Sequence, residues 1–223
     1  MNDSITLSQK IYLLSLNVKK GGFVSAAKSG LNYTILGGLL FELFENKNIR
    51  FEGKKIVVLD KRSKNDLYRF MLEKIGKTER PIKISRALGK FNFSMKFVLR
   101  QVQQGLVEKR MIRMEPKQFL FFKWEKPYLT NKQFVYKLVA EIERQISTGS
   151  ASEEEMILLS FIKPSGLLFR IYPDRRKRKT AKKKLEKMMV ENQVSEAVTG
   201  AIQAAQAVAA SVAASAAIAA SVH

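Results

Sequence analysis

Residues 106–129 read LVEKRMIRMEPKQFLFFKWEKPYL, and the interpretation of the whole chain starts from them. They predict the end of a helix and then a β-hairpin, with MIRM as the first strand, Glu115-Pro116-Lys117 as the turn and FLFF as the second strand. Proline suits a turn because its ring fixes φ and it has no N–H group for a strand ladder. Since successive side chains of a strand point to opposite faces, FLFF has two apolar faces. One face of this strand can pack against the core, and the other must be covered by another element or used to bind a partner.

The apolar strand of this hairpin lies in a basic setting. Five cationic residues surround it: Arg110, Arg113, Lys117, Lys123 and Lys126. An aromatic hairpin among cations suits a membrane surface or an anionic polymer. A strand that is simply buried on both faces is the structural alternative, and the sequence leaves both open.

The helix-then-hairpin pattern occurs twice in the chain. Residues 43–45 (LFE) precede 49–54 (IRFEGK) at the same offset at which residues 106–108 (LVE) precede 112–117 (IRMEPK). Self-similarity at a fixed offset usually reflects shared supersecondary structure. We therefore expect two helix-then-hairpin units.

Hydrophobic periodicity predicts a mainly α chain. Helices are expected over residues 5–16, 33–45, 65–75, 94–109, 130–146 (capped by Thr130), 153–162 (opened by a Ser152/Glu155 capping box) and 175–191, with an Ala-rich helix over 194–222. A first hairpin is expected at 49–59, a short connector at 81–90, and a close helix contact at Gly37-Gly38. Together these form one compact domain over 1–223, with helix-then-hairpin units at 1–60 and 94–129 and a helical remainder at 130–223.

Charge is the most informative feature of the composition. Against 20 Asp and Glu, the 223 residues include 40 Lys and Arg, so the net charge is +20. This balance points to nucleic acid or anionic lipid as partners and says little about fold. No basic-then-apolar leader is visible at the N-terminus, and alanine is a weak membrane-insertion signal. We expect a soluble, cytoplasmic protein that touches membranes only peripherally.

The residue types needed for most catalytic sites are missing from the sequence. There is no cysteine, and the one histidine is the last residue, His223. Thiolate sites, histidine-based triads and zinc sites are therefore excluded. No glycine-rich phosphate loop is present, and Glu153 to Glu155 occupy a helix first turn, where the macrodipole favours acids. We expect no enzyme, no cofactor and no metal.

The densest charge run lies at residues 175–184, RRKRKTAKKK. Such runs are usually solvated faces. Eight like charges in this segment also repel one another, and an anionic partner would relieve that repulsion. The candidate anion-binding residues of the run are Arg175, Arg176, Lys177 and Arg178.

Motifs in several parts of the chain agree in order and spacing with one known family. They are ITLSQKIYLLSLN near the N-terminus, a glycine-containing loop followed by LLFEL, the LVEK and FLFF motifs with PYLTN after them, and a basic run before an Ala-rich last helix. This order resembles the Golgi phosphoprotein three family, which contains phosphatidylinositol 4-phosphate-binding adaptors and prokaryotic relatives. The resemblance implies a single mainly helical domain, no catalysis, and docking on a membrane through an apolar hairpin tip beside a basic pocket.

Carried over by position, the resemblance places the membrane-inserting hairpin tip at Phe119, Leu120 and Phe121. The positions of the family's headgroup pocket are Ala27, Leu36, Lys96 and Leu99, of which Lys96 alone keeps a positive charge. Lys28 and Arg100 each lie one residue from a lost position, and one residue turns a helical side chain by about 100°. The candidate headgroup-binding residues are Lys96, Arg100 and Lys28, and we expect general affinity for anionic lipid with weak headgroup selectivity.

Two functions from different classes follow. The first is a peripheral membrane protein, an adaptor for an unknown protein partner, that binds an anionic phospholipid or phosphoinositide membrane. The second is a nucleic-acid-binding protein with tandem winged-helix-like units. The apolar FLFF segment offers no side-chain hydrogen-bond donors to DNA, so nucleic acid is the weaker candidate. A scaffold whose hairpin is core also stays open, as does the oligomeric state.

Overall fold

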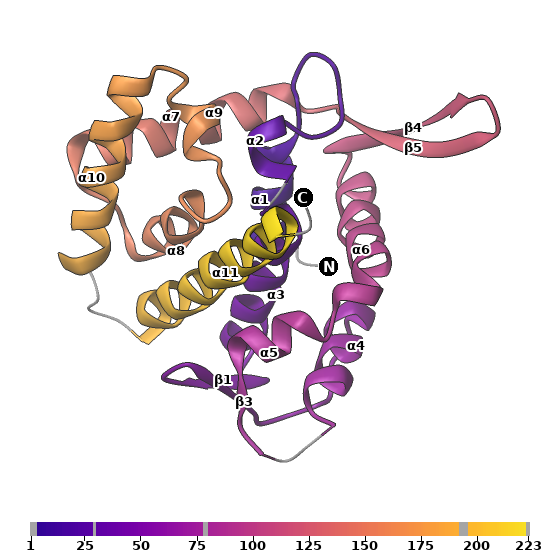
Figure 1. Cartoon of the computed structure of the whole chain (residues 1–223), viewed down its shortest axis with the longest axis vertical. Helices are drawn as coiled ribbons and strands as arrows, with labels where there is room; N and C mark the ends of the chain where they lie inside the picture. The colour runs from indigo at the N-terminus through magenta and orange to yellow at the C-terminus, as the bar shows by residue number, and fades with distance from the viewer. Residues whose placement is uncertain (1–3, 29, 78–79, 192–195, 222–223) are drawn as a thin grey trace.

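The computed structural model describes residues 4–28, 30–77, 80–191 and 196–221, and the chain is mainly helical, as predicted (Figure 1). The helices are α1 (Leu7–Ser15), α2 (Ser25–Lys28), α3 (Leu31–Glu45), α4 (Asp66–Ile75), α5 (Ile84–Gly89), the 3-10 turn η1 (Asn92–Ser94), α6 (Met95–Glu108), α7 (Lys132–Thr148), α8 (Glu153–Ile162), α9 (Leu168–Ile171), α10 (Arg175–Glu191) and α11 (Glu196–Ser221). The strands are β1 (Ile49–Glu52), β2 (Lys55–Val58), β3 (Ile82–Lys83), β4 (Ile112–Phe119) and β5 (Phe122–Leu129).

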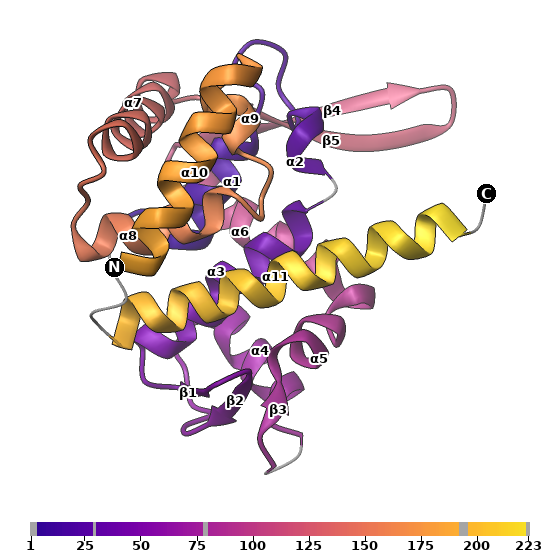
Figure 2. The ribbon, with the colours of Figure 1, turned by 60° about the vertical axis from the view of Figure 1, so that its left-hand side comes forward.

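Helix α3 lies at the centre, between α1 on one side and α11 on another (Figure 2). Two adjacent glycines permit both contacts, which confirms the predicted close helix packing. A Cβ on Gly37 would lie 2.6 Å from Val208 of α11 and 2.9 Å from Phe161 of α8. A Cβ on Gly38 would lie 3.2 Å from Ile11 of α1. Larger residues here would push the helices apart, since protein interiors are close-packed.

Side-chain caps set where several helices begin. The predicted box is present at α8, where Ser152 Oγ accepts from Glu155 N–H and the Glu155 carboxylate accepts from Ser152 N–H. Thr130 does not cap α7, so that prediction was wrong. Asn131 does so instead, and its side-chain oxygen accepts from Phe134 N–H at 3.0 Å. Asparagine and threonine stand side by side here, and asparagine is the stronger N-cap.

Both predicted helix-then-hairpin units are present, and their helices end in the same way. Lys47 after α3 and Arg110 after α6 have φ values of 58° and 56°. In each unit the next N–H donates to the carbonyl five residues back: Asn48 to Leu43 and Met111 to Leu106, both at 2.9 Å. This is the pattern of a Schellman cap, which turns the chain out of a helix. The sequence repeat therefore reflects a repeated local structure.

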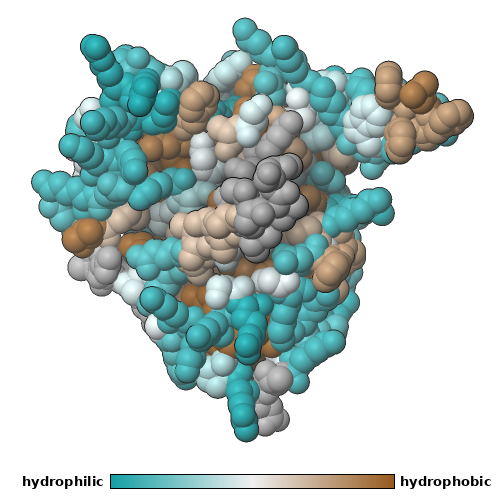
Figure 3. Space-filling model, viewed as in Figure 1, coloured by the Kyte–Doolittle hydropathy of each residue, from teal (hydrophilic) through white to brown (hydrophobic). Residues whose placement is uncertain are grey.

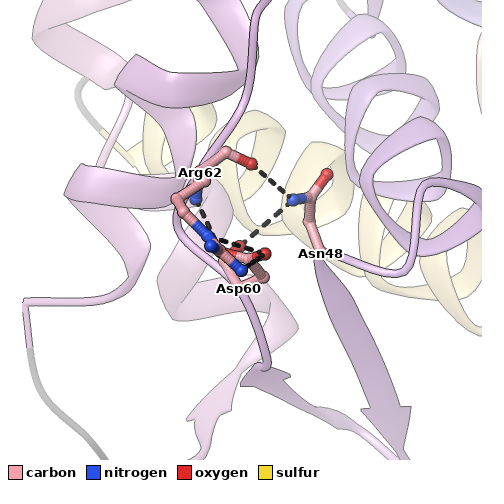
Figure 4. Close-up of polar contacts among 3 residues, drawn as sticks. All are labelled: Asn48, Asp60 and Arg62. Carbon is pink, nitrogen blue, oxygen red and sulfur yellow. Dashed lines mark hydrogen bonds and ion pairs between the residues drawn. The ribbon is translucent and has the colours of Figure 1, made fainter.

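Each hairpin is also closed at its base by one residue. The carbonyl of Asn48 accepts from the N–H groups of Leu59 and Asp60, at 2.8 and 3.1 Å. Its side-chain amide donates to the carbonyls of Asp60 and Arg62, as Figure 4 shows. Met111 is the equivalent residue in the second unit, where its carbonyl accepts from the two residues that follow β5. The two ends of each hairpin are thus fixed to the preceding helix.

The expected connector at residues 81–90 is the main error in the predicted fold. It contains β3, which extends the first hairpin to a three-stranded sheet, and helix α5. Ile84, Ala87 and Leu88 recur at helical spacing and are buried, but the run is too short to stand out as a helix from periodicity alone.

One buried carboxylate joins three helices. Glu42 of α3 accepts from the backbone N–H of Ser8 at 2.6 Å and from the hydroxyl of Tyr68 of α4 at 2.8 Å. Burial raises the pKa of Glu42 above its ordinary value of 4.5, and these hydrogen bonds oppose the shift only in part. The folded state therefore holds this proton to a higher pH than the unfolded state does.

This shift predicts how stability depends on pH. A carboxyl group with a raised folded pKa contributes stability that is full below its unfolded pKa and is lost as pH rises through the folded pKa. Glu42→Gln carries no titrating group, so its free energy of unfolding relative to wild type should rise from pH 5 to pH 7. Urea unfolding at both pH values measures the difference. Glu141→Gln, at an exposed position on α7, is the control, and parallel profiles for Glu42→Gln and wild type would contradict the assignment.

Candidate functional site

The second hairpin projects from the body as a two-stranded ribbon (Figures 1 and 2). Its strands pair from Ile112↔Leu129 to Phe119↔Phe122, so the turn is Leu120-Phe121. The predicted turn at Glu115-Pro116-Lys117 was wrong, as was FLFF as the second strand. Pro116 instead lies within β4, opposite Glu125. A two-stranded ribbon has two free edges, where a residue without an N–H group is tolerated.

The FLFF segment forms the tip of this ribbon and is exposed. Phe119 and Leu120 are 67% exposed, Phe121 95% and Phe122 73%. Figure 3 shows the outer end of the hairpin as a hydrophobic projection. The alternative in which this segment is core is thereby excluded. Contiguous exposed apolar side chains of this kind mark interaction sites more often than scattered single ones do.

Leu120 holds an unusual backbone conformation at the turn. Its φ is 53°, in the left-handed region that favours glycine, and two-residue hairpin turns usually place glycine or asparagine there. For a residue with a Cβ this conformation costs about 1–2 kcal/mol. The chain keeps a large apolar side chain at a position where glycine would be less strained. The backbone of the turn is therefore less stable than it would be with glycine at this position, and the tip gains an exposed apolar side chain.

The root of the hairpin is a cluster of cations around one aromatic ring. The charged groups of Arg113, Lys117 and Lys126 lie 5.4, 5.4 and 5.5 Å from the centre of the Tyr128 ring. Glu115 accepts hydrogen bonds from Lys117 and Arg113, and these bonds lower the pKa of its carboxyl group. One carboxylate thus partners two of the three cations, and the root stays positively charged behind the apolar tip.

A loop from the N-terminal half holds this root in place. Gly22 N–H donates to the Pro127 carbonyl at 2.8 Å. A Cβ on Gly21, where φ is +65°, would lie 2.5 Å from the Tyr128 ring. Only glycine allows the loop to approach the ring this closely. The root of the hairpin therefore packs against Gly21 and Gly22 of this loop, in addition to being joined to the body through its two strands.

Two predicted anion-binding residues lie on the helix that leads into the hairpin. Lys96 and Arg100 are exposed and one turn apart on α6. The side chain of Lys28 lies outside the part of the chain that the structure describes. Ala27 and Leu36, which the resemblance aligns with pocket positions, are fully buried in the core. Leu99, the remaining position, is half-buried and packs against the core. Of the four aligned positions, Lys96 alone presents a charge to solvent.

The basic start of α10 lies apart from the hairpin. Helix α10 and the hairpin tip are on opposite sides of the molecule in Figure 1 and remain well separated in Figure 2. Arg175, Arg176 and Lys177 are exposed. Arg178 is half-buried, and it donates to the carbonyl of Tyr172 and stacks 4.5 Å from the Phe169 ring centre. The structure thus places Lys96 and Arg100 near the start of α6, the helix whose other end leads into the hairpin, and leaves residues 175–178 on another face.

Sequence reasoning did not find Tyr128 as the centre of a cation cluster. The signal was the strand register, which places Arg113 opposite Tyr128 and Lys117 four pairs further toward the tip, on the same face. Side chains two residues apart share a face of the ribbon. With the turn misplaced at Pro116, the predicted register did not bring Arg113 and Lys117 to the same face as Tyr128.

The described residues lack two features that would point to other kinds of site. Among them no helix has both the length and the apolar character needed to cross a membrane. The same residues hold no group of three or more acidic, histidine or cysteine side chains arranged for a metal ion. The exposed hairpin and its cations are therefore the candidate functional site.

Comparison with known proteins gives one match. A family model described as Golgi phosphoprotein 3 (GPP34) matches residues 7–205, which include α6, both hairpins and the basic start of α10. No curated protein matches the chain.

Proposed function

Because this chain belongs to the Golgi phosphoprotein 3 (GPP34) family, we propose that it is a non-enzymatic, peripheral membrane protein that binds anionic phospholipid or phosphoinositide as an adaptor. The observation that supports this most is the exposed apolar tip at Phe119 to Phe122, carried on a ribbon with a cationic root. We place its site of action on the cytoplasmic surface of a membrane.

Two weak attractions acting together suit reversible attachment. Full burial of a phenylalanine side chain is worth about 1.5–3 kcal/mol. A lysine or arginine near an anionic surface adds about 1 kcal/mol. Stable anchoring usually needs two such signals. The tip supplies the first, and the root cations with Lys96 and Arg100 supply the second.

Binding should require anionic lipid and weaken with salt. The chain carries a net charge of +20, and salt screens exposed charges over a Debye length of about 8 Å at physiological ionic strength. Co-sedimentation with phosphatidylserine-containing vesicles should therefore exceed that with pure phosphatidylcholine, and the difference should shrink as salt is raised. Equal, salt-independent binding to both would contradict the proposal. Duplex DNA that displaces the protein at low concentration would favour a nucleic-acid-binding function instead.

Discrimination between headgroups should be weak. A phosphorylated inositol ring needs several convergent donors to repay its desolvation. Lys96 offers one donor, while the aligned Ala27 and Leu36 are buried. Phosphatidylinositol 4-phosphate should bind little better than another lipid of matched charge, and Lys96→Ala should cost about 1 kcal/mol or less. A preference above about tenfold for one phosphoinositide, equal to about 1.4 kcal/mol, would show a selective pocket elsewhere.

The basic start of α10 is proposed as a separate anion-binding surface. Helix α10 and the hairpin tip lie on opposite sides of the molecule, so at physiological salt the charges of α10 have little influence on a membrane that the tip contacts. Neutralising Arg175, Arg176 and Lys177 together should change vesicle binding by about twofold or less at physiological salt. If this variant loses more vesicle binding than a variant in which the hairpin cations are neutralised, α10 is the membrane-facing surface.

A further inference from the structure

A second pair of aromatic side chains is exposed near the start of α6. Phe93, on the η1 turn, is fully exposed, and Phe97 is 40% exposed. The Phe97 ring lies 4.7 Å from that of Phe70, which in turn lies 6.2 Å from the buried Phe91. The Phe97 ring thus ends a chain of aromatic contacts that reaches the core, and Phe93 lies beside the start of the same helix on the η1 turn.

The charges around these rings are all of one sign in the sequence. No Asp or Glu occurs between residues 81 and 107, whereas the same segment holds five cations: Lys83, Arg86, Lys90, Lys96 and Arg100. Lys74 of α4 adds a sixth, since its ammonium group lies 5.2 Å from the Phe70 ring centre and donates to Ser94 Oγ. Exposed aromatics in a segment that holds five cations and no acid complement a surface that is apolar inside and anionic outside, as an anionic bilayer is.

The position of these rings connects them to the hairpin. Helix α6 begins directly after η1 and ends four residues before β4. Figure 1 shows α6 below the root of the hairpin, on the side toward which the ribbon projects. Figure 3 shows a second hydrophobic patch on this side, below the hairpin and over the region of α5 and α6. One membrane surface can therefore meet both patches.

We propose that Phe93 and Phe97 form a second apolar contact with the same anionic membrane, and that Lys96 and Arg100 face its headgroups between the two contacts. This inference rests on the proposed function and adds the orientation of the bound protein. A plane through both contacts meets the ribbon obliquely, so the hairpin enters at a tilt with the exposed face of α6 toward the lipid.

The test uses the single tryptophan of the chain, Trp124, which lies on β5 near the tip. In a Trp124→Phe background, Phe93→Trp places the fluorophore on the second patch, and Phe169→Trp places it on α9 as a control. The vesicles contain equal parts of brominated phosphatidylcholine and phosphatidylserine. Fluorescence at position 93 should shift to shorter wavelength and be quenched by these vesicles. Fluorescence at position 169 should not change.

A binding measurement on vesicles of the same lipids without bromine complements the quenching. Phe93→Ser should weaken co-sedimentation by about tenfold, which corresponds to 1.4 kcal/mol. Because the side chain is fully exposed, the variant should keep the wild-type thermal midpoint. If native Trp124 is quenched but position 93 is not, or if Phe93→Ser binds as wild type, the second contact is refuted and the proposed function stands. If neither position is quenched, the proposed function itself fails.

Discussion

Vesicle binding is expected to fall by about a hundredfold in the double variant Phe119→Ser/Phe121→Ser. Both side chains lie at the exposed tip of the second hairpin. Full burial of two phenylalanines in lipid is worth about 3–6 kcal/mol, and a hundredfold loss corresponds to about 2.8 kcal/mol, near the lower end of that range. Binding is measured by co-sedimentation with phosphatidylserine-containing vesicles, and the emission of Trp124 reports entry of the ribbon into lipid.

The same variant should keep the fold. Truncation of a buried phenylalanine typically costs about 3–5 kcal/mol, but these two side chains are already in water. The thermal midpoint should therefore stay within a degree or two of wild type, on the order of what surface substitutions produce. Val190→Ser is the matched control, since Val190 is an exposed apolar residue on α10, away from the hairpin. A collapsed midpoint, or unchanged binding, would show that the tip is not a membrane contact.

Arg170→Met is expected to lower the free energy of unfolding by about 3 kcal/mol. The guanidinium of Arg170, on α9, donates to the carbonyls of Leu14 and Leu16 at the end of α1. Both of these residues are fully buried. Hydrogen bonds from charged groups contribute about 1.5–3 kcal/mol each, and their loss leaves two buried acceptors unsatisfied. Burial lowers the pKa of Arg170.

Denaturant unfolding measures this effect against two controls. Arg175→Met removes an exposed arginine on α10 and should change stability by less than about 0.5 kcal/mol. Arg170→Lys keeps one charged donor and should recover part of the loss. If Arg170→Met unfolds like Arg175→Met, the two carbonyls have found other donors, and Arg170 does not join α9 to α1.

The sequence predicts the supersecondary units better than their register. The repeated motifs identify both hairpins because helix end, cap and strand recur at one offset, and the Schellman caps at Lys47 and Arg110 give that offset its physical cause. Pro116 led to a misplaced turn, because proline marks a turn in most contexts and a free strand edge in this one.

Site prediction had a different limit. The apolar tip could be found from composition, but four consecutive apolar residues do not distinguish an exposed tip from a buried strand. Tyr128 could be identified as a cation-binding ring only from the correct strand register, which places it opposite Arg113. Phe93 stands among polar neighbours in the sequence, and its exposure depends on how η1 leaves the buried Phe91.

The two prolines of the ribbon bear on how copies of this protein can crowd on one membrane. Pro127 faces Met114 and Pro116 faces Glu125, two pairs apart, so both prolines occupy the class of pair whose backbone nitrogens point outward. Each free edge of the ribbon thus lacks one outward N–H donor. A strand from a second copy therefore cannot add along the full length of either edge. The ribbon can thus present contiguous aromatic residues at its tip without offering a continuous edge for intermolecular β-sheet growth.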